Sequence, residues 1–81
     1  MKVVINKKAI KDLKRIDFKM KDKIHSQFLE LKKFPNLPNI KSLTNFTPKF
    51  RLRVGDYRIL FDVIDETVEI LRVLNRKESY K

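Results

Sequence analysis

The 81-residue sequence has no cysteine, no tryptophan, a single glycine and a single histidine. Without cysteine it can form no disulfide, and it offers neither a thiolate nucleophile nor a thiolate metal ligand. Because His25 is the only histidine, the usual ligands of a zinc site are also too few. We therefore expect no metal and no cofactor, and any chemistry has to come from other side chains.

The sequence also lacks long apolar runs, repeats and linkers rich in glycine or serine. Its length suits one domain, residues 1–81, with a small core. The first residues, MKVVINKKAIKDLKRI, hold no apolar stretch long enough for a signal peptide or a membrane span. The sequence therefore predicts a cytoplasmic protein with no membrane contact.

Positive charge is abundant: 20 Lys and Arg stand against 10 Asp and Glu, a formal net charge of +10. Residues 1–33 hold eleven basic and four acidic residues, whereas residues 49–81 hold eight and six. Such an excess predicts attraction to a polyanion, either nucleic acid or an acidic protein. A basic surface that only keeps the chain soluble is the simpler alternative.

The first half predicts one strand and two helices. Residues 2–5 are short and β-branched, which is typical of a strand. Asn6 and Asp17 each precede a run with apolar residues at helical spacing, so each is expected to cap a helix. Phe34-Pro35 should end the second helix. The apolar positions expected to pack in the core are Ala9, Ile10, Leu13 and Ile16 in the first helix and Met20, Ile24, Phe28 and Leu31 in the second.

The second half predicts three strands, at residues 49–54, 57–64 and 67–75, after an exposed connection at 39–48. Gly55-Asp56 fits a two-residue hairpin turn with glycine first, where φ is positive. Asp65-Glu66 can make the next turn. The expected order is β-α-α-β-β-β, an α+β fold with a largely antiparallel sheet and two N-terminal helices packed on one face.

The Gly55-Asp56 turn fixes the register of its hairpin, and the register sorts the side chains between the two faces of the sheet. The face toward the helices receives Phe50, Leu52, Val54, Tyr57, Ile59 and Phe61. The other face receives Lys49, Arg51, Arg53 and Arg58, with Arg53 directly across from Arg58. Like charges opposed in this way are destabilising. A phosphate group would offset them, since the arginine fork matches phosphate oxygens; the alternative is a set of charges spread into water.

This C-terminal half resembles the RelE branch of the RelE/ParE toxin superfamily. The similarity lies in the hairpin Phe50-Arg-Leu-Arg-Val-Gly-Asp-Tyr-Arg-Ile-Leu-Phe61, in the following strand, and in the ending Asn75-Arg-Lys-Glu-Ser-Tyr80. The motif covers residues 49–80, and the predicted architecture agrees over the whole chain. The resemblance implies metal-independent cleavage of mRNA on the ribosome. It also implies a cognate antitoxin, and with it a toxin–antitoxin hetero-oligomer.

Carried over to this sequence, the resemblance implies a catalytic set and a set of RNA-binding positions. The catalytic set is Lys49, Arg51, Arg58, Arg76 and Tyr80, and the RNA-binding set is Arg53, Asn75 and Lys77. Asn75 departs from the pattern, because several members have a histidine there that can act as an acid or a base.

RNA can be cut without metal when its own 2′-hydroxyl attacks the adjacent phosphate. Arg58 and Arg76 are suited to stabilise the developing phosphorane charge, and Tyr80 to stack on or orient a base. Lys49 is the candidate proton acceptor, because neighbouring arginines disfavour its ammonium form. His25 is expected mid-helix, away from the hairpin, as a surface or packing residue.

Two alternatives remain open. The ParE branch has the same fold but acts on DNA gyrase and is not a nuclease. The other alternative is a catalytically inactive module that uses its charge only to bind RNA or the ribosome.

Overall fold

A computed structural model of the chain describes residues 1–37, 40–42 and 48–75. Within these residues, no helix is long and apolar enough to cross a membrane. The elements in chain order are β1 (Lys2–Ile5), α1 (Lys7–Lys14), α2 (Phe18–Glu30), the short 3-10 helix η1 (Leu31–Lys33), β2 (Ile40–Ser42), β3 (Phe50–Val54), β4 (Tyr57–Ile64) and β5 (Thr67–Asn75).

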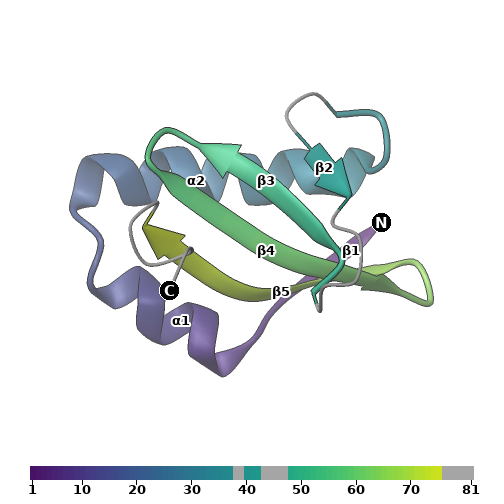
Figure 1. The fold of residues 1–81 in the computed structure, drawn as a ribbon, viewed down its shortest axis with the longest axis horizontal. Coiled ribbons are helices and arrows are strands. Elements are labelled where there is room, and N and C mark those ends of the chain that lie inside the picture. The colour runs from purple at the N-terminus through teal and green to yellow at the C-terminus, as the bar shows by residue number, and fades with distance from the viewer. Residues whose placement is uncertain (38–39, 43–47, 76–81) are drawn as a thin grey trace.

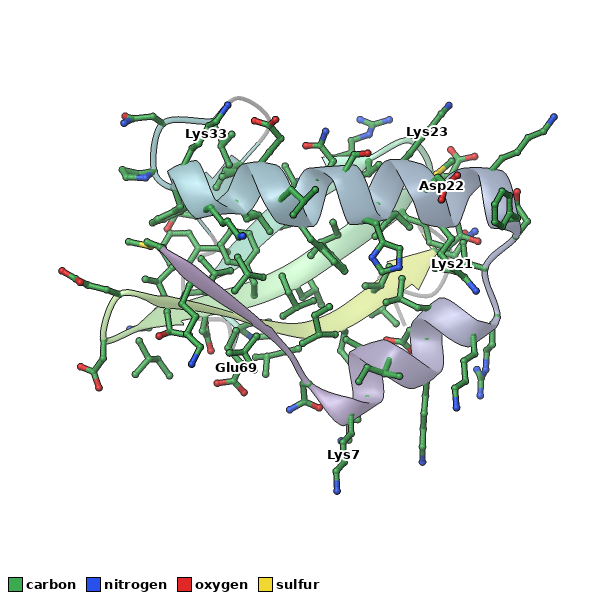
Figure 2. All side chains as sticks on the ribbon, turned by 180° about the vertical axis from the view of Figure 1, so that it is seen from behind. Lys7, Lys21, Asp22, Lys23, Lys33 and Glu69 are labelled. Atoms are coloured by element: carbon green, nitrogen blue, oxygen red, sulfur yellow. The ribbon has the colours of Figure 1, made fainter. Side chains whose placement is uncertain are left out.

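The strands form one five-stranded sheet in the order β1-β5-β4-β3-β2. The first and last strands, β1 and β5, run parallel, and the other neighbouring pairs are antiparallel. Both helices lie on one face of this sheet, behind it in Figure 1 and in front of it in Figure 2. The predicted α+β class is therefore confirmed.

Both helices begin where the sequence predicts. The Asn6 side chain accepts a hydrogen bond from the Lys8 backbone N–H at 2.9 Å, which satisfies one of the free donors of the first turn of α1. Asp17 accepts from the Met20 backbone N–H at 3.4 Å and caps α2 in the same way. At its other end α2 passes into η1, which stops just before Phe34-Pro35.

The hairpin register is also confirmed. Val54 pairs with Tyr57, Leu52 with Ile59 and Phe50 with Phe61. Gly55 has φ +58°, as a turn with glycine first requires, and Asp65 and Glu66 both have positive φ in the next turn. The one small difference is that β3 begins at Phe50, so Lys49 lies just before the strand.

The exposed connection predicted for residues 39–48 is wrong in part. Ile40–Ser42 form the strand β2, which pairs antiparallel with Phe50–Leu52 at the edge of the sheet. Three residues are too few to show an alternating pattern, so the sequence gives no strand signal there. Both Lys41 and Ser42 are exposed, and a short, charged strand is a common way to protect a sheet edge from further pairing.

The core lies between the helices and the near face of the sheet. Its buried apolar residues are Ala9, Leu13, Ile16, Ile24, Phe28, Leu31, Leu52, Val54, Ile59, Phe61, Val68, Ile70 and Val73. Two expected members differ from the prediction: Ile10 is 44% exposed, and Met20 is only partly buried against the core. The side of α1 that faces the sheet holds Ala9, Asp12 and Leu13, so Ile10 points outward and Asp12 inward, and Ile16 is buried just after the helix.

Asp12 is a buried carboxylate that joins α1 to β5. Its two oxygens accept hydrogen bonds from Nε and a terminal nitrogen of Arg72, at 2.8 and 3.0 Å. One oxygen also accepts the backbone N–H of Val73 at 2.9 Å. Because β1 ends at Ile5, opposite Ile70, the later part of β5 has no strand beside it on that edge. The Asp12 side chain takes the place of the missing strand there.

We predict that Asp12→Ala lowers the free energy of unfolding by about 1–3 kcal/mol, because a buried N–H and a partly buried guanidinium lose their acceptor. For a domain of this size, each 1 kcal/mol corresponds to a change of about 4–8 °C in melting temperature. Thermal melting measures the effect. The matched control is Asp22→Ala, which removes an exposed carboxylate from α2 (Figure 2) and should leave melting nearly unchanged. Equal melting of the two variants would contradict the role given to Asp12.

Candidate functional site

The β3–β4 hairpin brings three of the predicted cations together on the sheet face away from the helices. Arg53 lies directly opposite Arg58, and Arg51 lies opposite Leu60 on the same face. The structure adds a fourth cation that sequence reasoning missed, because Lys41 of β2 pairs with Arg51. Lys49 lies one residue before β3, at the end of this row. These five residues, Lys41, Lys49, Arg51, Arg53 and Arg58, are called the basic face below.

Exposure differs across the basic face. Lys41, Lys49 and Arg53 are exposed, Arg51 is partly buried, and Arg58 is only 7% exposed. A buried arginine is held in one orientation and is shielded from water, so it interacts more strongly with a nearby anion than an exposed one does. The basic face therefore combines one buried cation with four more exposed ones around it.

The hairpin turn beside Arg53 is supported from below by α2. A Cβ atom built at Gly55 would lie 3.1 Å from the Met20 Cε atom, which is tighter than an ordinary contact. In addition, Nε of Arg53 donates to the Gly55 carbonyl oxygen at 3.4 Å. The start of α2 and the turn therefore pack directly on each other, which holds the end of the hairpin that carries Arg53 and Arg58.

An irregularity between β4 and β5 decides which residues border Arg58. Leu60 pairs with Arg72 but Phe61 pairs with Ile70, so Leu71 is an extra residue on β5. Beyond this bulge, Leu74 lies opposite Arg58 and Asn75 lies opposite Tyr57. Asn75 thus sits on the side of the sheet that faces the helices, apart from the arginines with which it was predicted to bind RNA. The local signal for the bulge is the break in the apolar alternation of β5, which runs from Val68 to Ile70 and resumes at Val73.

Three predicted site residues, Arg76, Lys77 and Tyr80, lie outside the described residues and stay predictions. His25 lies on α2, exposed, with its ring edge-on to Phe28 at 5.7 Å between centroids. It borders a shallow depression between β1 and α2 together with Val3, Ile5 and Lys32. In the part of the chain that the structure describes, no three His, Asp or Glu side chains come together as metal ligands.

The far end of the same sheet face is acidic. Asp62 lies directly opposite Glu69, and Asp65 and Glu66 form the turn just beyond them. Glu69 points away from the body of the sheet in Figure 2. The face is therefore positive toward the Gly55 turn and negative toward the Asp65 turn, with Leu60 between the two ends on β4. A polyanion is attracted to the first end and repelled from the second. The signal was present in the sequence as four acids within residues 62–69.

Comparisons with known proteins show similarity to toxins in both sequence and fold. A family model described as the ParE toxin of type II toxin–antitoxin systems matches residues 3–80. Toxin RelE3 of Methanocaldococcus jannaschii is 33% identical over 84 residues, which cover 99% of this chain and 96% of the relative. The fold is also similar to solved structures. A RelB-RelE antitoxin-toxin complex from Methanococcus jannaschii contains a chain with TM-score 0.82 and 31% identity, covering 95% of this chain and 94% of that one.

A second solved structure is the toxin-antitoxin complex RelBE2 from Mycobacterium tuberculosis. It matches with TM-score 0.77 and 30% identity over 93% of this chain and 96% of that one. Fold, basic face and these similarities define a small toxin of a type II toxin–antitoxin system. The chain belongs to the RelE/ParE toxin superfamily, and its relatives named RelE match over nearly its full length.

The opposed arginines should cost stability in the isolated protein. We predict that Arg53→Thr raises the free energy of unfolding by about 0.2–1 kcal/mol, because it removes a like-charge pair across two strands. The gain should shrink as salt is added, since salt screens the repulsion. Melting curves at low and high salt test this, with Arg53→Lys as the control that keeps the charge. A gain that is equal for both variants would show that repulsion is not the cause.

Proposed function

We propose that the protein is a ribosome-dependent endoribonuclease that cleaves mRNA and so blocks translation in the cytoplasm. The observation that carries this proposal is the register of the β3–β4 hairpin, which sets Arg53 across from Arg58 with Arg51 beside them. A protein that needed only its fold would gain from separating these charges. A phosphate backbone between them turns the repulsion into binding.

The chemistry follows from the residue types on the basic face. The 2′-oxygen of the RNA attacks the adjacent phosphorus while its proton passes to a base. The bond from phosphorus to the 5′-oxygen breaks, and a proton passes to the leaving 5′-oxygen. The products are a 2′,3′-cyclic phosphate and a 5′-hydroxyl end. We assign stabilisation of the negative charge on the phosphorane to Arg58 and Arg76. We assign acceptance of the 2′-hydroxyl proton to Lys49, which lies just before β3. Arg51 and Arg53 hold the flanking phosphates, with Lys77 as a further RNA contact, and Tyr80 stacks on a base.

The ribosome enters this proposal as the element that shapes the substrate. Free RNA is flexible and seldom places its 2′-oxygen in line with the 5′-oxygen. A site made of cations, without a histidine near them, gains much from a substrate that is already aligned. Exposed lysines on α1 and α2, such as Lys7 and Lys23, point into solvent (Figure 2) and add long-range attraction to ribosomal RNA.

A cognate antitoxin is the second proposed partner, in a hetero-oligomer. The solved relatives from Methanococcus jannaschii and Mycobacterium tuberculosis are both complexes of a toxin with its antitoxin. We propose that an acidic antitoxin segment covers the basic face or displaces residues 76–80. The first mode would neutralise Arg51, Arg53 and Lys49 and keep RNA away, and the second would remove Arg76 and Tyr80 from the site.

Inhibition of DNA gyrase is the second candidate function, and one observation favours it: the matching family model is that of the ParE toxin. The basic face argues for the nuclease, because a toxin that binds a protein needs no arginines held opposite one another. A translation extract separates the possibilities. Cleavage of mRNA with toeprints at codons supports the nuclease, and inhibition of gyrase supports the ParE-like function. Ribosome binding with neither activity supports an inactive binding module.

We predict that Arg58→Ala and Arg76→Ala each lower single-turnover cleavage of mRNA on ribosomes by ~10²-fold or more, the usual effect of losing one electrostatic donor. Ribosome binding should change much less, because the helical lysines still attract RNA. Since Arg58 is buried, Arg58→Lys and a melting curve of each variant are needed to separate lost catalysis from lost folding. Variants that are folded and still cleave at the wild-type rate would overturn the nuclease assignment.

Binding of the antitoxin to the folded toxin alone stabilises the toxin by mass action. We therefore predict a higher melting temperature for the toxin when its antitoxin is co-expressed, by an amount that grows with antitoxin concentration. Replacing Arg51 and Arg53 together by Ala should weaken the effect if the acidic segment lies on the basic face. An unchanged melting temperature in the presence of the antitoxin would contradict the pairing.

A further inference from the structure

The position of Lys49 depends on one side chain from the neighbouring strand. Lys49 lies outside the paired residues of β3, which start at Phe50 opposite Phe61. Its backbone N–H donates to Oδ1 of Asp62, on β4, at 2.6 Å. The residue before it, Pro48, has no N–H of its own to donate. The Asp62 carboxylate thus extends the hairpin by one residue beyond its last backbone pair.

Asp62 is costly for the fold at this place. It lies directly opposite Glu69 on the same face of the sheet, and like charges so opposed destabilise a sheet. A neutral side chain would avoid the repulsion. The hydrogen bond to the Lys49 N–H offsets the cost, since a carboxylate accepts from an amide more strongly than a neutral group does.

The geometry points to a specific task. The side chain of Lys49 is exposed, so its own packing cannot determine where its ammonium group lies. Fixing the backbone of Lys49 fixes the point from which the side chain extends, at the end of the row that continues into Arg51 and Arg53. We propose that Asp62 is a positioning residue for the reaction: it holds Lys49 at the entrance of the basic face through the backbone. This inference rests on the proposed nuclease function.

The test compares three variants of the full chain. Asp62→Ala removes the acceptor, Asp62→Asn keeps an oxygen that can accept the same hydrogen bond, and Glu69→Gln removes the opposing charge and is the matched control. The first readout is hydrogen exchange at the Lys49 amide. It should be protected in the wild type, in Asp62→Asn and in Glu69→Gln, and should exchange faster in Asp62→Ala.

The second readout is single-turnover cleavage on saturating ribosomes. Asp62→Ala should lower the rate by ~10-fold or more, the scale expected when a reacting group is misplaced by about 1 Å. Half-saturation by ribosomes should not change. Asp62→Asn should recover most of the loss, and Glu69→Gln should cleave like the wild type. An Asp62→Ala variant with wild-type cleavage, or an Asp62→Asn variant as slow as Asp62→Ala, would overturn the proposal.

A double-mutant cycle separates positioning from general stability. If Asp62 acts through Lys49, then Asp62→Ala should add little to the loss already caused by Lys49→Ala. If the fold-losses in cleavage rate of the two single variants instead multiply in the double variant, Asp62 acts independently of Lys49. A wild-type protein that does not cleave mRNA refutes the proposed function. A Lys49 amide that exchanges at the same rate in the wild type and in Asp62→Ala refutes the positioning role on its own.

Discussion

The contact of Asp12 with Arg72 and Val73 is the constraint on which the arrangement of the molecule depends. Strand β5 lies between β1 and β4, and it is longer than β1. Where β1 stops, a helix has to complete the edge, and a helix can do so only by presenting a side-chain acceptor. A buried carboxylate is tolerated because three donors surround it. Through this contact α1 is fixed to the part of β5 that borders Arg58.

The outer face of the sheet shows where function has been favoured over stability. This face holds two like-charge pairs, and in each pair the two residues lie opposite each other on adjacent strands: Arg53 opposite Arg58, and Asp62 opposite Glu69. Each pair is unfavourable in the isolated fold, and they have opposite signs at opposite ends. Together they give the face a direction, with its positive end toward the Gly55 turn and its negative end toward the Asp65 turn. The apolar packing on the other face supplies the stability that this arrangement requires.

Local signals allowed most of the fold to be predicted. Each helix-capping side chain accepts a hydrogen bond from a backbone N–H no more than three residues away. The turn at Gly55 determines the register of its hairpin by itself. Features that depend on residues far apart in the chain were missed. Asp12 looked like an ordinary polar residue of α1 because Arg72 is distant in sequence, and Ile40–Ser42 became a strand only because β3 lies beside it. The bulge at Leu71 arises from the fit of β5 to β4, and it moved Asn75 away from the arginines.

The parallel pairing of β1 with β5 joins the two ends of the chain, since Lys2 lies beside Thr67 and Ile5 beside Ile70. During synthesis β1 and α1 precede the other described elements, whereas β5, which pairs with β1 and supplies the Arg72 and Val73 donors for Asp12 of α1, follows all of them. Chains with such distant contacts close their sheet late. Nascent chains that have not yet released β5 cannot join β1 to β4 and cannot provide the Arg72 and Val73 donors for Asp12. The sheet can therefore close only after β5 has been synthesised, and shortened products that end before Thr67 lack the strand that joins β1 to the rest of the sheet.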